Sequence, residues 1–213
     1  MQNKKVVIIL VVALLAIFFV SGYVYNNMQK QKELEKVQNN NTSLVRPHSY
    51  IDGKKDAKVE LVEFLDPACG TCALFHPYVK EIKKQNGDDI KIVYRYAPFH
   101  EGSDKVVKLL EAAKEQGKFN ELLELLFVTQ KYWVKHHVVQ YDIVEKIAEK
   151  SGLIDMVVAK EFVKNPKLDE IIKQDLADAK ALGANKTPSF FVNSKPLEDF
   201  GLEQLIELIN SEL

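Results

Sequence analysis

One stretch of sequence decides the fold, KVELVEFLDPACGTCALFHP at residues 58–77. Its first part, Lys58–Leu65, is a short apolar run rich in valine and aromatic side chains, which is typical of a strand buried on both faces. Apolar residues then recur at helical spacing over about 69–85, and IKIVYRYA at residues 90–97 predicts a second strand. Because a strand–helix–strand unit needs a parallel crossover, the stretch predicts a mixed α/β sheet flanked by helices.

The folded domain is predicted to span residues 49–213. Periodic apolar residues in several segments between Ser103 and Leu182 predict a helical block inside the α/β chain. The chain then returns to a strand at 189–193 and is expected to pair again around 196–200. An amphipathic helix over 202–213 is expected to close the domain.

The charge balance and the cysteine count argue against two classes of protein. The chain has 213 residues, is 46% hydrophobic, and balances 29 Lys and Arg against 30 Asp and Glu. It contains no arginine-rich or aromatic-basic stripe, so we expect no nucleic-acid partner. Its two cysteines cannot form a disulfide framework, and a core of this size does not need one. The cysteines are therefore expected to do chemistry.

The N-terminus predicts export. Residues 6–24 are almost entirely apolar, which favours an uncleaved transmembrane anchor, and the lysines in residues 1–5 predict a cytoplasmic tail. A signal peptide cleaved around 20–22 is the alternative. The polar, amide-rich segment 25–48 is typical of a linker. We therefore expect a membrane-anchored domain in the periplasm or another extracytoplasmic space, where oxidising conditions favour disulfides.

The two cysteines are spaced as a Cys-x-x-Cys pair that directly follows a predicted strand and opens a predicted helix. Helix-terminal N–H groups and the helix dipole stabilise a thiolate there, so Cys69 is expected to attack and the more enclosed Cys72 to resolve the mixed disulfide. A metal chaperone using Cys69, Cys72 and His76 is the alternative. A structural zinc site, however, usually has four ligands, and the sequence has no second cysteine pair.

Four features in order resemble thioredoxin-fold proteins of the DsbA type. They are Glu63 six residues before the CGTC pair at 69–72, Pro77 five residues after it, and Thr187-Pro188 before a strand. The resemblance covers the whole predicted domain and implies that the helical block is a DsbA-like insertion. It also implies a protein thiol-disulfide oxidoreductase without a cofactor or a bound metal.

Glu63 shares its strand face with three apolar residues, Val59, Leu61 and Leu65, so its side chain is expected to point into the core. Burial raises the pKa of a carboxyl group toward values useful for moving protons. The resemblance places an acid beneath the cysteines, and we expect Glu63 to be a proton shuttle. The alternative is an acid that reaches water near the end of the sheet, as expected for Glu60.

The resemblance implies a cis bond between Thr187 and Pro188, facing the cysteines. Such a bond exposes the preceding backbone to a substrate strand, so Thr187 is expected to bind substrate together with Gly70 and Thr71. The pair at 70–71 lacks the histidine of CPHC proteins and the proline of CGPC proteins. Thiolate stabilisation in the reduced state makes a stronger oxidant, so an oxidant less extreme than DsbA is expected.

Two other residues carry weaker expectations. His76, before Pro77, is expected to lie on the surface of a kinked helix. Trp133 is expected to pack in the core of the insertion, with an apolar groove beside Cys69 as the alternative location.

The sequence thus predicts an exported enzyme that forms, isomerises or reduces disulfides through Cys69 and Cys72. Its expected partners are cysteine-containing exported proteins, an unknown redox partner that recycles the dithiol, and the membrane. A redox-inactive adaptor that presents the helical insertion is a third possibility.

Overall fold

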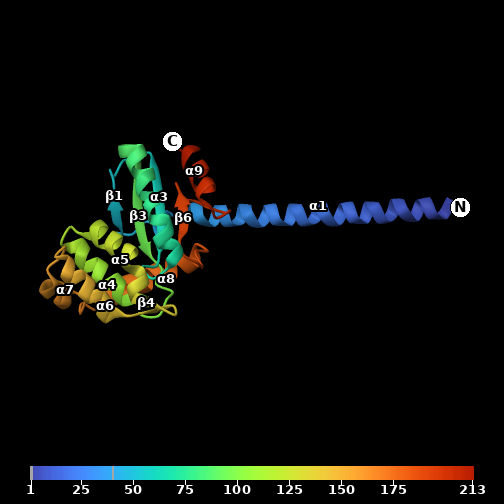
Figure 1. The fold of residues 1–213 in the computed structure, drawn as a ribbon. Helices are drawn as coiled ribbons and strands as arrows, with labels where there is room; N and C mark the ends of the chain where they lie inside the picture. Colours follow the sequence, from blue (N-terminus) through green and yellow to red (C-terminus); the bar gives the residue numbers. More distant parts are fainter. Residues whose placement is uncertain (1, 40) are drawn as a thin grey trace. The chain divides into compact units, whose positions relative to one another are not determined.

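The computed structural model describes residues 2–39 and 41–213, which belong to two separate compact units (Figure 1). The first unit is a single helix, α1 (Gln2–Asn39), which extends well into the segment 25–48. Among the residues described, no helix is both long and apolar enough to cross a membrane. The side chains of 2–9 and 11–13 lie outside the described residues, so the tail and the anchor stay predictions.

The second unit is built on a mixed five-stranded sheet, as the strand–helix–strand unit predicts. β2 and β3 are parallel, and every other neighbouring pair is antiparallel. The strand order is β1 (Tyr50–Asp52), β3 (Ile90–Tyr96), β2 (Val59–Leu65), β6 (Ser189–Val192) and β7 (Lys195–Pro196). The pairing expected at 196–200 is thus shorter and begins one residue earlier.

Helices surround this sheet. α3 (Gly70–Asn86) connects β2 to β3 and contacts α9 (Leu202–Asn210), with the turn η1 (Gly87–Asp89) between α3 and β3. The expected helical block comprises α4 (Ser103–Glu115), α5 (Phe119–Trp133), α6 (Tyr141–Ser151), α7 (Met156–Phe162) and α8 (Lys167–Ala181). Figure 1 shows α4 to α7 gathered together beside the sheet.

A short hairpin that the helical periodicity does not predict interrupts the block. It consists of β4 (Val134–Lys135) and β5 (Val138–Val139), which pair antiparallel. The two residues of its turn, His136 and His137, have φ values of 49° and 65°. This left-handed conformation suits a tight two-residue hairpin.

The main core fills the face of the sheet that carries Val59, Leu61 and Leu65, where α3 and the insertion contribute their apolar side chains. Trp133, at the end of α5, is 0% exposed, and its indole N–H donates to the carbonyl of Leu126 at 3.0 Å. Its expected place in the core is confirmed. The alternative, that it lines a groove beside Cys69, is wrong because the ring has no exposed surface.

The opposite face of the sheet holds a buried charge network. Arg95 of β3 is completely buried and lies 2.7 Å from both Asp175 and Asp178 of α8. Its guanidinium also donates to the carbonyl of Leu44 at 2.7 Å, and Arg46 pairs with Asp178 at 2.7 Å. The end of the segment 25–48 therefore packs on the sheet through long-range ion pairs.

Candidate active site

The end of β2 and the start of α3 position the two cysteines. Cys69 is the N-cap residue of α3 and has an extended backbone, with φ −78° and ψ 122°. Its side chain is 8% exposed, whereas that of Cys72, one turn into the helix, is 0% exposed. Both are free thiols. The more accessible sulfur is thus the one expected to attack, and the enclosed sulfur is the one expected to resolve.

Asp66 anchors the loop that leads to Cys69. Its carboxylate is fully buried and accepts hydrogen bonds from the backbone N–H of Ala68 at 2.8 Å, of Phe99 at 2.8 Å and of His100 at 2.9 Å. The Ser103 hydroxyl also donates to it, and Nδ1 of His100 lies 2.7 Å away. Asp66 thus ties the cysteine loop to the segment that follows β3.

A second clamp comes from the helical insertion. Nε2 of Gln130, on α5, donates to the carbonyl oxygens of Pro67 at 2.8 Å and Cys69 at 3.1 Å. Neither Gln130 nor Asp66 is among the residues that the sequence predicts to act at the site. A carboxylate directly after a buried strand was a readable signal for Asp66, but Gln130 is 61 residues from Cys69 and had none.

The two thiols differ strongly in acidity. The pKa of Cys69 is lowered to about 5, mainly by the hydrogen bond from the Cys72 side chain and against the effect of burial. Backbone N–H groups of Thr71 and Cys72 also favour its thiolate. The pKa of Cys72 is raised well above its ordinary value, first by burial and then by the same hydrogen bond. At neutral pH one thiolate and one thiol are therefore expected.

Glu63 lies in β2, on the core face, where the strand register places it between Tyr94 and Phe190. Its side chain is 1% exposed, and neither carboxyl oxygen has a hydrogen-bond partner among the described residues. Burial raises its pKa to about 8, and the negative charge of Cys69 adds to this. The expectation of a buried position is confirmed, whereas Glu60 is partly exposed and pairs with Lys91 at 3.1 Å.

The loop before β6 lies against the cysteines. The Thr187–Pro188 peptide bond is cis, as the resemblance implies. Sγ of Cys69 lies 3.2 Å from the carbonyl oxygen of Thr187, to which it donates a hydrogen bond when it is a thiol. Gly70 and Thr71 are exposed beside Cys69. The structure thus brings all four of these regions together: the cysteine pair, Thr187, Pro188 and the 70–71 tip.

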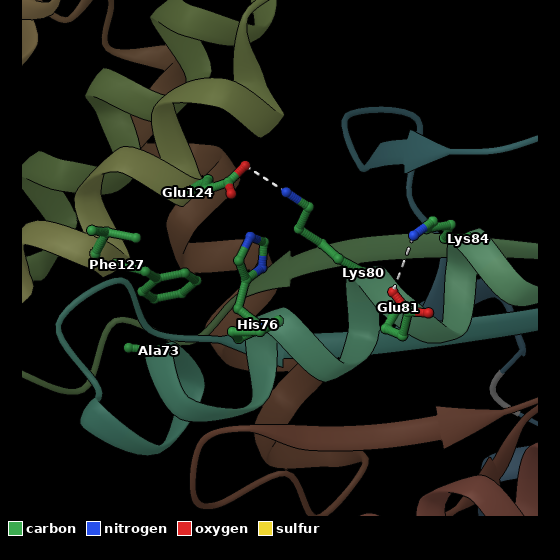
Figure 2. A pocket seen from close by; sticks show the side chains of 9 residues that line it. Ala73, His76, Lys80, Glu81, Lys84, Glu124 and Phe127 are labelled. Atoms are coloured by element: carbon green, nitrogen blue, oxygen red, sulfur yellow. Dashed lines mark hydrogen bonds and ion pairs between the residues drawn. The ribbon is translucent and has the colours of Figure 1, made fainter.

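The expectation for His76 is wrong. α3 continues through Pro77, and His76 is only 4% exposed, because its ring lies between α3 and α5 with its centroid 5.1 Å from that of Phe127 (Figure 2). Among the residues described, no group of three or more His, Cys, Asp or Glu side chains is arranged to hold a metal ion. The alternative chaperone site at Cys69, Cys72 and His76 therefore has no support in this geometry.

Comparison with known proteins identifies the family and the solved structures that this chain resembles. A family model described as Thioredoxin matches residues 46–211. The crystal structure of a thioredoxin-like oxidoreductase from Silicibacter pomeroyi has 27% sequence identity and a TM-score of 0.67, covering 79% of this chain and 95% of that one. BdbD from Bacillus subtilis, with 24% identity and a TM-score of 0.68 over 78% of this chain and 92% of that one, shares the fold.

Two curated relatives differ in name and in length. The Na⁺/H⁺ antiporter NhaA of Herminiimonas arsenicoxydans is 32% identical over 149 residues, which are 70% of this chain but 23% of that protein. A Rickettsia conorii protein named as a protein-disulfide oxidoreductase is 26% identical over 189 residues, 87% of this chain and 68% of that protein. The chain thus spans about a quarter of the antiporters' length (23–25% for the first few).

Proposed function

We propose that this chain, which belongs to the thioredoxin family, is a DsbA-like thiol-disulfide oxidoreductase with Cys69 and Cys72 as its redox pair, and that it exchanges disulfides with exported proteins. The observation that carries this proposal is the inequality of the two sulfurs. One is acidic and slightly exposed, and the other is less acidic and fully enclosed. Thiol-disulfide exchange requires this division, since one sulfur must meet the substrate and the other must release it.

The exchange proceeds in two steps. A substrate thiolate attacks Sγ of Cys69 in the oxidised pair, the Cys69–Cys72 bond breaks, and its electron pair leaves on Sγ of Cys72. A second substrate thiolate then attacks the substrate sulfur of the mixed disulfide and releases Cys69 as a thiolate. The substrate loses two electrons and gains a disulfide, while the pair gains both electrons. The same steps in reverse reduce a substrate disulfide.

Glu63 supplies and removes the proton of Cys72. With a pKa of about 8, its carboxyl group is mostly protonated at neutral pH and can donate to the thiolate that leaves. The charge of an ionised Glu63 raises the pKa of Cys72, so the proton is held more tightly by the Cys72 sulfur once Glu63 has given it up. Glu63 is thus the proton shuttle of the buried sulfur.

The acidity of Cys69 favours an intermediate redox poise. A pKa of about 5 lies between about 3.5 in the strongly oxidising DsbA and about 7 in the reducing thioredoxin. Thiolate stabilisation favours the dithiol form and so makes the disulfide a stronger oxidant. The protein is therefore a weaker oxidant than DsbA and a weaker reductant than thioredoxin, and a second redox protein restores its pair.

The substrate binds at the tip formed by Gly70 and Thr71 and along the backbone of Thr187. Gly70 and Thr71 are exposed next to Cys69, and the Thr187 carbonyl lies 3.2 Å from its sulfur. A peptide that pairs with the Thr187 backbone brings its own cysteine to this sulfur. Pro188, which follows, restricts the loop on which this pairing depends.

The N-terminal segment anchors the domain outside the cytoplasm. The support is the apolar sequence of 6–24, which follows two lysines, and the exposure of the apolar side chains described there, such as Phe18 and Phe19. Extraction of membranes with alkaline carbonate tests this. Retention of the full chain in the membrane pellet supports an anchor, and its complete release to the supernatant contradicts one.

Trapping of mixed disulfides tests the redox proposal. In a Cys72→Ser variant Cys69 can still attack a substrate disulfide, but no enzyme sulfur remains to resolve the mixed disulfide. Incubation of the reduced variant with scrambled, disulfide-bonded ribonuclease in the absence of glutathione should therefore accumulate a covalent complex. Cys69→Ser should form none, and Val157→Ser, on the distant exposed surface of α7, should turn over like the wild type. Absence of a complex with Cys72→Ser, or refolding catalysis that survives Cys69→Ser, would overturn the proposal.

A further inference from the structure

A cavity of about 350 Å³ lies between α3 and α5, along α3 from the cysteine pair toward the C-terminal end of that helix. Its lining includes Ala73, Pro77 and Val128, together with the side chains shown in Figure 2. Neither cysteine lines it, and no step of disulfide exchange uses it. Its volume falls at the lower end of the range for small-molecule sites, which are mostly apolar with a few polar groups.

His76 is the buried polar side chain of this cavity. Its ring projects from α3 toward α5, and the residue is only 4% exposed. Neither ring nitrogen has a hydrogen-bond partner among the described residues. Buried polar atoms are normally paired, so an imidazole in this state needs an explanation. Burial lowers its pKa to about 4, so the ring is neutral at pH 7 and offers one N–H donor and one nitrogen acceptor.

The charged side chains around the cavity form ion pairs with one another. Nζ of Lys80 lies 2.5 Å from Oε2 of Glu124, and Nζ of Lys84 lies 3.7 Å from Oε2 of Glu81 (Figure 2). Two cations thus face two anions, and the lining has no net charge to attract an ionic ligand. Phe127 supplies an aromatic face whose centroid is 5.1 Å from that of the His76 ring.

We propose that this cavity binds a small neutral aromatic molecule that carries a hydroxyl group, a ligand of the phenol class. The aromatic ring packs on Phe127 and the apolar wall, and the hydroxyl pairs with the imidazole of His76. A hydroxyl suits this imidazole because it both donates and accepts, and so meets either ring nitrogen. A carboxylate would have to break the Lys80–Glu124 pair to find a cation, and a toluene would leave the imidazole unpaired.

A titration of the full chain with phenol tests the proposal, followed by NMR at the backbone amides of Ala73 and Val128. Small ligands of this size bind at about the millimolar level. Saturable shifts at both amides are expected, with phenol binding about three- to tenfold more tightly than toluene, the factor of one net hydrogen bond. Benzoate and benzylamine should bind less well than phenol.

Two variants and a control test separately the hydrogen bond to His76 and the location of the bound ligand. His76→Phe keeps an aromatic ring but removes both nitrogens, so the preference for phenol over toluene should fall to about onefold. Val128→Trp places a large ring from an exposed position into the cavity and should abolish the binding of both ligands. Val157→Trp, at another exposed position on α7, should leave binding unchanged. The absence of saturable shifts, a preference for benzoate, or a phenol preference that survives His76→Phe would each overturn the proposal. The Val128 variant decides the location even if His76→Phe fails to fold.

Discussion

Replacement of Glu63 by glutamine should change how the stability of the domain depends on pH. The folded protein holds this carboxyl group at a pKa of about 8 against an ordinary value of 4.5, mainly because it is buried without a partner. A group whose pKa is raised on folding contributes stability that is fully present below pH 4.5 and is lost as the pH rises through about 8. This rise in the pKa from 4.5 to about 8 corresponds to about 5 kcal/mol, of which about 3 kcal/mol is lost by pH 7.

Glu63→Gln cannot titrate, so the variant should gain on the wild type as the pH rises. The difference between their free energies of unfolding should change by about 5 kcal/mol between pH 4 and pH 9. Cys69, whose pKa is lowered on folding, titrates in the same range, but it is present in both proteins and largely cancels from the difference.

Urea unfolding of the two reduced proteins measures this difference. Trp133 is the only tryptophan and is fully buried, so its fluorescence reports the transition. Parallel stability profiles for the two proteins would refute the reasoning, because they would show that Glu63 has the same pKa in the folded and unfolded chains. Because the Glu63 carboxyl group titrates near pH 8, Glu63→Gln should also slow thiol-disulfide exchange, and the rate of that exchange should no longer change with pH near 8.

Three further outcomes follow from the site and its supports. Iodoacetamide should alkylate Cys69 of the reduced protein with a midpoint near pH 5, leaving Cys72 unmodified, and a midpoint near 9 would contradict the acidity described here. Arg95→Met should lower the free energy of unfolding at pH 7 by about 3–5 kcal/mol, because it leaves buried carboxylates without their cation. Urea titration measures this loss, and one below about 1 kcal/mol would show that other donors compensate. Asp66→Asn should speed hydrogen exchange at the amide of Phe99 about tenfold, from the loss of about one charged hydrogen bond, and NMR exchange rates unchanged from the wild type would argue against its anchoring role.

Much of the site could be predicted from the sequence because its residues sit in local patterns. The side-chain alternation in β2 is enough to place Glu63 in the core, and the strand-then-helix order is enough to put Cys69 at a helix start and Cys72 inside. These inferences need only the period of a strand and the chemistry of a helix end. The cis bond at Thr187–Pro188 came from the resemblance, since the residues alone equally allow an ordinary turn.

The missed features depend on residues far apart in the chain. Arg95 and Asp175 are 80 residues apart, and no periodicity links them, so the packing of residues 44–48 could not be read from the sequence. His76 was misplaced for a related reason. Its own helix leaves that face free, and only the approach of α5, with Phe127, covers it. The β4–β5 hairpin is too short to interrupt a helical pattern visibly.

The strand register separates two kinds of buried charge. Glu63 pairs with Tyr94 and Phe64 pairs with Arg95, so the lone acid and the ion-paired network occupy opposite faces of one sheet. The network is lost in acid, since the lowered pKa values of Asp175 and Asp178 contribute stability only above their ordinary value of 3.8. The ionisation of the lone acid weakens the fold as the pH rises from about 4.5 to about 8. The domain therefore has a working range of pH with two separately built limits, and a substitution on one face can move one limit while leaving the other in place.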